Sequence, residues 1–129
     1  MLTQAAHHYS LDVSDIEVSR RFYGDLLGLS EIDRPDFGIP GVWYQAGPVQ
    51  LHLIQTPDGM DVGTRAPSLN PLSAHIAFEI DSYERVEAEL REAGIDMQAL
   101  GTRAGQIFVR DPDGNTIEFI QPAGTRGRS

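Results

Sequence analysis

Apolar and polar residues along this chain follow two periods, and the periods succeed each other in a fixed order. Residues 7–13 alternate as a β-strand does, and apolar residues in 16–27 then recur at the spacing of one helix face. Gly28 ends that predicted helix, as glycine often does just past a helix. Three further strands are predicted at 29–33, 42–45 and 49–55.

The second half of the chain repeats this order. Residues 72–80 read as a strand, and residues 82–93 carry apolar residues at steps of three and four before Gly94. Further strands are predicted at 95–100, 106–110 and 116–121. The pattern is therefore strand–helix–strand–strand–strand, written twice, which predicts a fold built from an internal repeat.

Polar residues mark where the two helices begin. The stretch "SDIE" has the form of a capping box, with Ser14 as the N-cap and Glu17 three residues later. In the second half, Asp81 or Ser82 is expected to cap the helix. These caps give two reference points from which the halves can be aligned.

The remaining segments define the domain organisation. With 129 residues, the chain is expected to be a single domain, made of a first unit at 7–55 and a second at 72–122. Residues 56–71 contain three Pro and two Gly without periodicity, and read as a linker. Residues 123–129 are expected to form a flexible tail.

Charge and composition exclude several classes of function. A net charge of −9 argues against binding to nucleic acid or to anionic membranes. No apolar run approaches the ~18 residues of a membrane span, and the first residues lack the pattern of a signal peptide, so a cytoplasmic location is expected. Cysteine is absent, which excludes disulfides and thiolate chemistry.

The histidines fall into register when the two halves are aligned. His8 lies seven residues before Asp15, and His75 lies seven residues before Ser82, an offset of 75 − 8 = 67. In the last strands, "VQLHLIQ" and "NTIEFIQ", His52 and Glu118 take the same place, at an offset of 118 − 52 = 66.

Three imidazoles and one carboxylate at equivalent positions predict a metal site. If the two units are related by a pseudo-twofold axis, the four side chains converge on one point. Such a ligand set suits a divalent ion such as Zn, Ni, Fe, Mn or Co. A single His in a strand is more often structural, but agreement across a repeat is harder to explain by chance. His7 has no counterpart and is expected to point to the opposite face, so it is interpreted as structural or exposed. The predicted metal ligands are His8, His52, His75 and Glu118.

The motifs resemble those of the vicinal oxygen chelate superfamily, which includes glyoxalase I, extradiol dioxygenases, fosfomycin-resistance thiol transferases and bleomycin-resistance proteins. The similar stretches include "SRRFYGDLLGL", "HIAFEI" and "FVRDPDGNTIEFIQP", and together they cover most of residues 7–122. The resemblance implies an α+β fold in which two tandem βαβββ units form a cupped mixed sheet around a metal. It also places the family's ligands on the first and last strands of each unit, at the four residues named above.

The resemblance leaves the reaction open. A glyoxalase-like lyase or isomerase is favoured, in which the metal acts as a Lewis acid on a small oxygen-chelating substrate. Glu118 is then the candidate base, and His52 is the second candidate. Glyoxalase I has a glutamate where this chain has His52, so His52 is either a ligand or lies one shell out. The alternatives are an extradiol dioxygenase, a thiol transferase, and a metal-free drug-binding protein, against which the ligand set counts.

Four residues are candidates for substrate contacts. Arg34 and Arg103 lie in predicted loops and are able to hold a carboxylate or phosphonate, although a solvated surface arginine is the simpler interpretation of each. Gln106 lies near the same loops, and Trp43, with Phe37, provides an apolar wall or part of the core. Small members of the family are usually homodimers, which predicts a dimer here. The candidates for substrate binding are Arg34, Trp43, Arg103 and Gln106.

Overall fold

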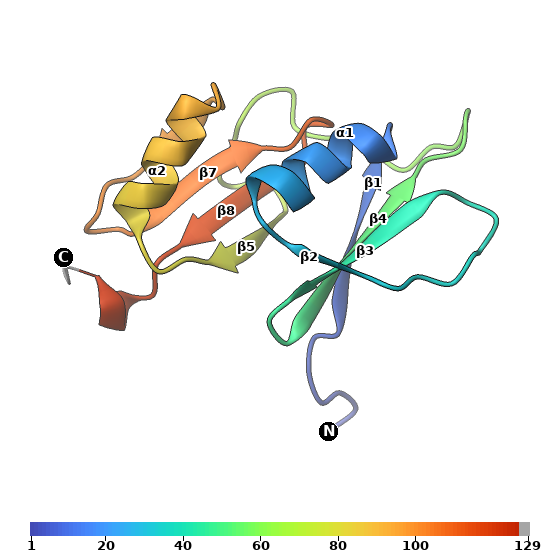
Figure 1. The fold of residues 1–129 in the computed structure, drawn as a ribbon, viewed down its shortest axis with the longest axis horizontal. Coiled ribbons are helices and arrows are strands. Elements are labelled where there is room, and N and C mark those ends of the chain that lie inside the picture. Colours follow the sequence, from blue (N-terminus) through green and yellow to red (C-terminus); the bar gives the residue numbers. More distant parts are fainter. Residues whose placement is uncertain (127–129) are drawn as a thin grey trace. The chain divides into compact units, whose positions relative to one another are not determined.

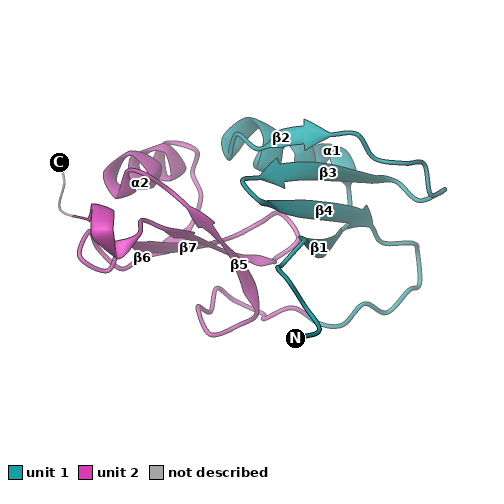
Figure 2. Cartoon of the chain, turned by 90° about the horizontal axis from the view of Figure 1, so that it is seen from below, with its two compact units in different colours: residues 1–64 teal, residues 65–129 magenta. Residues whose placement is uncertain are grey.

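The computed structural model describes residues 1–126, which divide into two compact units. One unit comprises Met1–Thr64 and the other the described residues from Arg65 onward, coloured separately in Figure 2. The boundary falls inside the predicted linker 56–71. Each unit contains one four-stranded mixed sheet and one main helical segment, so the predicted α+β fold with two βαβββ units is confirmed.

In the first unit the strand order across the sheet is β1-β4-β3-β2. Strands β1 and β4 are parallel, and the other two pairs are antiparallel. The elements, labelled in Figure 1, are β1 (His8–Val13), α1 (Ile16–Arg20), the π-helix η1 (Arg21–Leu26), β2 (Ser30–Ile32), β3 (Gly41–Ala46) and β4 (Val49–Gln55).

The second unit repeats this topology in the order β5-β8-β7-β6. Strands β5 and β8 are parallel, as β1 and β4 are. The elements are β5 (His75–Glu79), α2 (Tyr83–Glu92), β6 (Met97–Ala99), β7 (Gln106–Arg110), β8 (Thr116–Ile120) and the short 3-10 helix η2 (Ala123–Thr125).

Alternation along the strands separates each sheet into an apolar face and a polar face. In β4, Leu51 and Leu53 are fully buried, and in β8 Ile117 and Phe119 are buried. The buried helix residues, such as Tyr23 and Tyr83, complete these cores. The candidate ligands in β4 and β8 have the opposite parity, so they are carried on the other face of each sheet.

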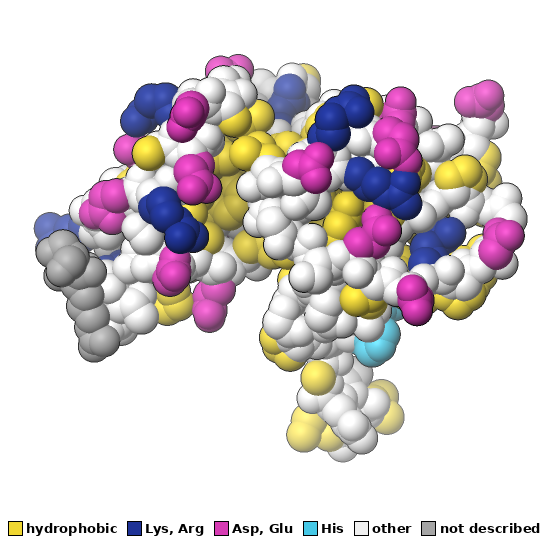
Figure 3. Space-filling view, in the orientation of Figure 1, with side chains coloured by type: hydrophobic (Ala, Val, Ile, Leu, Met, Phe, Trp, Pro, Cys, Tyr) yellow, Lys and Arg dark blue, Asp and Glu magenta, His cyan; other side chains and the backbone are white. Residues whose placement is uncertain are grey.

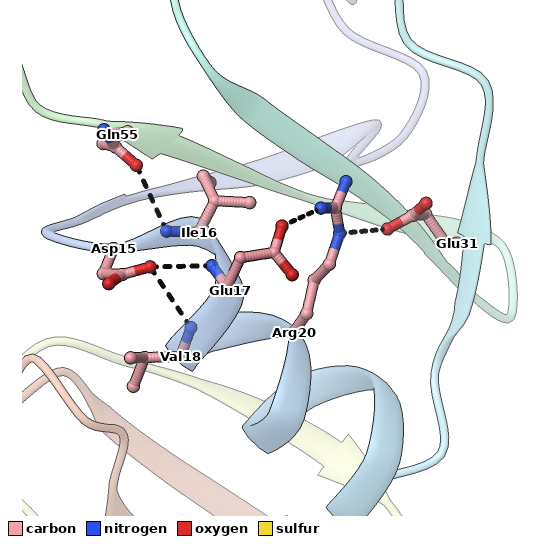
Figure 4. A network of polar contacts seen from close by, with 7 residues as sticks. All are labelled: Asp15, Ile16, Glu17, Val18, Arg20, Glu31 and Gln55. Carbon is pink, nitrogen blue, oxygen red and sulfur yellow. Dashed lines mark hydrogen bonds and ion pairs between the residues drawn. The ribbon is translucent and has the colours of Figure 1, made fainter.

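A glutamine at the end of the last strand holds the start of the helix in each unit. Gln55 Oε1 accepts a hydrogen bond from the Ile16 backbone N–H at 3.2 Å, as Figure 4 shows. Gln121 Oε1 accepts one from the Tyr83 N–H at 2.9 Å. Both amides belong to the first helical turn, where N–H groups have no partner within the helix. The repeat is thus preserved at the level of single hydrogen bonds.

Two local predictions differ from the structure, and a third, which left two residues open, is resolved by it. Asp15, not Ser14, is the N-cap of α1, because its carboxylate accepts from the N–H groups of Glu17 and Val18 (Figure 4). Of the two caps considered for α2, Ser82 is the one observed. The first helix changes to π geometry after Arg20, and the Leu27 N–H binds the Phe22 carbonyl five residues back.

The chain end also differs in part from the predicted flexible tail. Residues Ala123–Thr125 form η2, and the Arg126 Nε–H donates to the Gln121 carbonyl. The prediction for residues 127–129 lies outside the described part. Within residues 1–126, the helices are too short and too polar to cross a membrane. The homodimer and the cytoplasmic location stay predictions.

We expect Gln121→Ala to lower the free energy of unfolding by about 1–3 kcal/mol, because it leaves a buried N–H of Tyr83 without an acceptor. Gln55→Ala should cost less, because its hydrogen bond is longer and only partly buried. Urea denaturation monitored by circular dichroism measures both. The exposed Gln98 of β6 supplies the control variant Gln98→Ala. Equal effects of all three substitutions would contradict this role.

Candidate metal centre

In the second unit, the parallel pairing of β5 with β8 brings His75 to Glu118. Ala77 is directly opposite Glu118 in the register, so His75 lies two residues along the same face. The His75 Nε2 atom is 3.0 Å from Glu118 Oε1. Glu118 is 6% exposed, whereas the His75 side chain is about one quarter exposed. A buried carboxylate therefore has its imidazole partner at the side that is open to solvent.

The hydrogen bonds of His75 indicate what must lie between its Nε2 atom and Glu118 Oε1. Its Nδ1 lies 2.7 Å from the Ser73 carbonyl oxygen, which can only accept, so Nδ1 is the donor. In a neutral imidazole Nε2 then carries an electron pair, and it faces a carboxylate that also offers electron pairs. Two such atoms at 3.0 Å need a cation between them, either a proton or a metal ion.

Gln106 completes the surroundings of the carboxylate. Its Nε2–H donates to Glu118 Oε2 at 3.1 Å, so the two carboxylate oxygens have different partners. Phe108, opposite Glu118 in β7, makes a T-shaped contact with the His75 ring at a centroid distance of 5.5 Å. The position of Glu118 is therefore fixed from two neighbouring strands.

In the first unit, the equivalent pairing brings His8 to His52. Ser10 is opposite His52, so His8 is again two residues along the same face. The two rings are stacked at 4.0 Å with an angle of 12° between their planes. Trp43, opposite His52 in β3, stacks on the other side of His52 at 4.1 Å. His52 is thus held between two flat rings.

One nitrogen of His52 is already engaged. Nε2 lies 2.9 Å from Gln50 Oε1, an acceptor, so Nε2 donates and Nδ1 carries the electron pair of the neutral ring. Burial lowers the pKa of His52, and the neighbouring charges of His8, His7 and Arg34 act in the same direction. Both effects favour the neutral imidazole, which is the form that binds metals.

The structure brings together two of the predicted ligands in each unit. Among residues 1–126, no group of three or more His, Asp or Glu side chains is arranged to hold a metal ion. His7 is exposed, as expected, but its Nδ1 lies 2.9 Å from Nδ1 of His8, a contact that strand alternation does not anticipate. His7 precedes β1, so the alternation of that strand does not apply to it.

The four residues predicted to contact substrate differ in how close they lie to the candidate metal ligands. Trp43 and Gln106 touch the candidate ligands, as described above. Arg34 stands 5.1 Å from the centroid of the Phe37 ring, and that ring is 6.1 Å from Trp43. Arg103 is exposed, and its carbonyl accepts a hydrogen bond from Arg126. Two of the four candidates therefore touch a candidate ligand, and Arg34 is connected to Trp43 through the Phe37 ring.

An open groove of about 850 Å³ also lies in the first unit. It runs between the start of α1 and the loop that joins β2 to β3, and none of the four candidate ligands lines it. Arg20 is bound there by Glu17 and by Glu31, whose carboxylate is 2.9 Å from Arg20 Nε (Figure 4). The pKa of Arg20 is raised, chiefly by the hydrogen bond to Glu31. Size alone does not make this groove the reactive site.

Two polar partners of the candidate ligands are not among the residues predicted from the sequence. Gln50 and the Ser73 carbonyl bind one ring nitrogen of His52 and of His75 respectively. Gln50 was findable in principle, because it stands two residues before His52 and therefore on the same strand face. A backbone carbonyl leaves no signal in residue type.

The family model of the Glyoxalase/Bleomycin resistance protein/Dioxygenase superfamily matches residues 5–119. Together with the repeated βαβββ topology, this match places the chain in that superfamily.

Named relatives support the same assignment. The chain is 33% identical over 119 residues to glyoxylase I 4 of Arabidopsis thaliana, covering 88% of this chain and 68% of that protein. It is 32% identical to a lactoylglutathione lyase of Neisseria meningitidis, covering 88% of each. A glyoxalase family protein from Bacillus anthracis has a similar structure, with a TM-score of 0.72 and 26% identity over 94% of this chain and 97% of that one.

In the metal-free protein at neutral pH, we expect His75→Ala to lower the free energy of unfolding by about 1–3 kcal/mol, because the buried Glu118 loses its partner. Adding Glu118→Gln should restore most of this loss, because the amide carries no charge. Urea unfolding of the two single variants and the double variant measures the coupling. The exposed Glu84 provides the control Glu84→Gln. Independent, additive effects of the two substitutions would contradict a paired role.

Proposed function

We propose that the protein is a divalent-metal-dependent enzyme that acts as a glyoxalase-like lyase or isomerase on a small oxygen-chelating substrate. The observation that carries this proposal is the pair formed by His75 and Glu118. With Nδ1 bound to a carbonyl, the neutral form of His75 directs an electron pair at a carboxylate oxygen 3.0 Å away. A metal ion coordinated by both groups satisfies this arrangement.

The donor set fits such an ion. The first unit offers the imidazoles of His8 and His52, and the second unit offers the imidazole of His75 and the carboxylate of Glu118. Zinc and its neighbours in the first transition row accept this mixture. Metal-binding imidazoles commonly donate their second N–H to a carbonyl or carboxylate, and His52 and His75 each have a comparable oxygen acceptor in place.

A bound divalent ion would supply Lewis acidity to two substrate oxygens. The residues of the chain then have separate tasks. Glu118 is the proposed proton acceptor, because a carboxylate near an acidic C–H is a competent general base. Gln106 positions Oε2 of that carboxylate through its 3.1 Å hydrogen bond. His52 is the second candidate, with Nδ1 free of the hydrogen bond that occupies Nε2.

Metal binding is expected to quench the emission of Trp43, the only tryptophan in the chain, which stacks on His52. Chelator-treated protein should bind Co²⁺ or Ni²⁺ in fluorescence and calorimetric titrations. His75→Ala and Glu118→Gln should weaken binding at least tenfold, and Glu84→Gln should not. Binding should also weaken as the pH falls, because protons compete with the metal ion for the imidazoles. No binding of Zn, Ni, Mn, Co or Fe(II) would contradict a metal-dependent function.

Activity distinguishes the related reactions. The metal-loaded protein should convert a hemithioacetal of an α-ketoaldehyde to the hydroxyacyl thioester, and Glu118→Gln should abolish turnover while the circular dichroism spectrum is unchanged. Cleavage of a catechol by the Fe(II) form would instead assign a dioxygenase. Binding of a bleomycin-type drug that is unchanged by His75→Ala, without metal binding, would assign a binding protein.

A further inference from the structure

The guanidinium group of Arg34 occupies a slot that a glycine leaves open. A Cβ atom added to Gly41 would lie 2.6 Å from Arg34 Cζ and 2.7 Å from its Nε. Gly41 is not among the glycines with positive φ, so its backbone does not require glycine. The added Cβ would also lie 2.6 Å from the Leu53 carbonyl oxygen, so both the backbone of β4 and the guanidinium group of Arg34 exclude a side chain at position 41. Because Gly41 and Trp43 share one strand face, the guanidinium lies on the face that carries His52.

This cation is not neutralised within the part of the chain that the structure describes. Arg34 Nε is buried without a hydrogen-bond partner. None of the ion pairs formed by residues 1–126 includes Arg34, although Asp33 and Asp36 are close in sequence. Asp36 instead accepts a hydrogen bond from the Gly38 N–H. A buried donor without an acceptor is costly, and a bound ligand with acceptor oxygens removes that cost.

Aromatic rings border the guanidinium. The Phe37 ring lies 5.1 Å from Arg34 Cζ and is 59% exposed. Trp43 follows at 6.1 Å from Phe37 and stacks directly on His52. A fixed positive charge thus stands at one end of a row of flat apolar surfaces, and a candidate ligand stands at the other.

The second unit uses the equivalent position differently. Gly41 is opposite Ile54, and Gln106 is opposite Ile120, so the two residues correspond in the repeat. Gln106 donates to Glu118. In the first unit the side chain is missing, and Arg34 fills the place without donating through Nε to any protein group. This difference between otherwise matching units indicates that Arg34 binds a ligand and not another group of the protein.

We propose that Arg34 binds a carboxylate group of the substrate, while the planar or apolar part of the substrate lies against Phe37 and Trp43. The planar guanidinium fork matches a carboxylate or phosphonate with two parallel hydrogen bonds, which an ammonium cannot reproduce. This inference rests on the proposed function for the reaction, and it adds the substrate class: an anion whose charged group is separate from its chelating oxygens.

Fluorescence of Trp43 tests the proposal with and without metal. Chelator-treated and Zn-loaded full-length protein is titrated with benzoate, phenylphosphonate and the neutral analogue benzamide. We expect saturable changes with the two anions and much weaker changes with benzamide. Arg34→Gln should weaken anion binding roughly tenfold or more, and Arg34→Lys should weaken it less. The exposed Arg85 of α2 provides the matched control Arg85→Gln, which should leave the affinity unchanged.

A second readout follows the arginine itself. In ¹H–¹⁵N spectra, the Nε–H resonance of Arg34 should shift on addition of benzoate and not of benzamide. Anion binding of equal strength in wild type and Arg34→Gln would overturn the inference, as would the absence of any anion effect on Trp43 and on the Arg34 resonance. A protein that binds the anions through Arg34 but binds no metal would overturn the proposed function alone. Metal binding without anion binding would overturn only the role of Arg34.

Discussion

The parallel pairing of the first strand with the last strand is the constraint on which each unit depends. It places β1 beside β4 and β5 beside β8, and so brings together residues more than forty positions apart in the chain. The same pairing sets the side from which the helix returns, and Gln55 and Gln121 secure that return by binding the first helical amides. The helix side of each sheet becomes core, and the opposite face is left for polar chemistry.

Electrostatic requirements then give the polar faces their character. In the second unit a carboxylate that is 6% exposed lies 3.0 Å from Nε2 of His75, whose other nitrogen is bound to the Ser73 carbonyl oxygen, so a proton or a metal ion is needed between the two groups. In the first unit, His52 is stacked between Trp43 and His8, and burial lowers its pKa. Elsewhere, acidic and basic side chains are interspersed on the surface shown in Figure 3, as expected for a solvated exterior.

The sequence predicted the fold well because its signals are local and repeated. The spacing of apolar residues can be recognised from short stretches of the sequence. So can the glycines that end the helices, Gly28 and Gly94, both of which have positive φ. The pairing of His75 with Glu118 followed from aligning the halves, since equivalent residues in a repeat take equivalent places. The predictions that failed concern details at the level of single residues. Ser14 and Asp15 are both good caps, and only the backbone geometry selects Asp15. The Ser73 carbonyl and the slot over Gly41 depend on three-dimensional packing, which no spacing reveals.

The separation of the paired residues along the chain has a consequence for how each unit forms. His75 and Glu118 are 43 positions apart, so a contact between them closes a large loop. Closing this loop costs chain entropy before the new contacts can stabilise it. The helix and the antiparallel hairpin between them involve much shorter separations and can assemble earlier. The two side chains therefore meet only when the last strand docks beside the first. During synthesis, β8 is made last in its unit. Until β8 is available, β5 has no parallel partner, and His75 and Glu118 cannot pair.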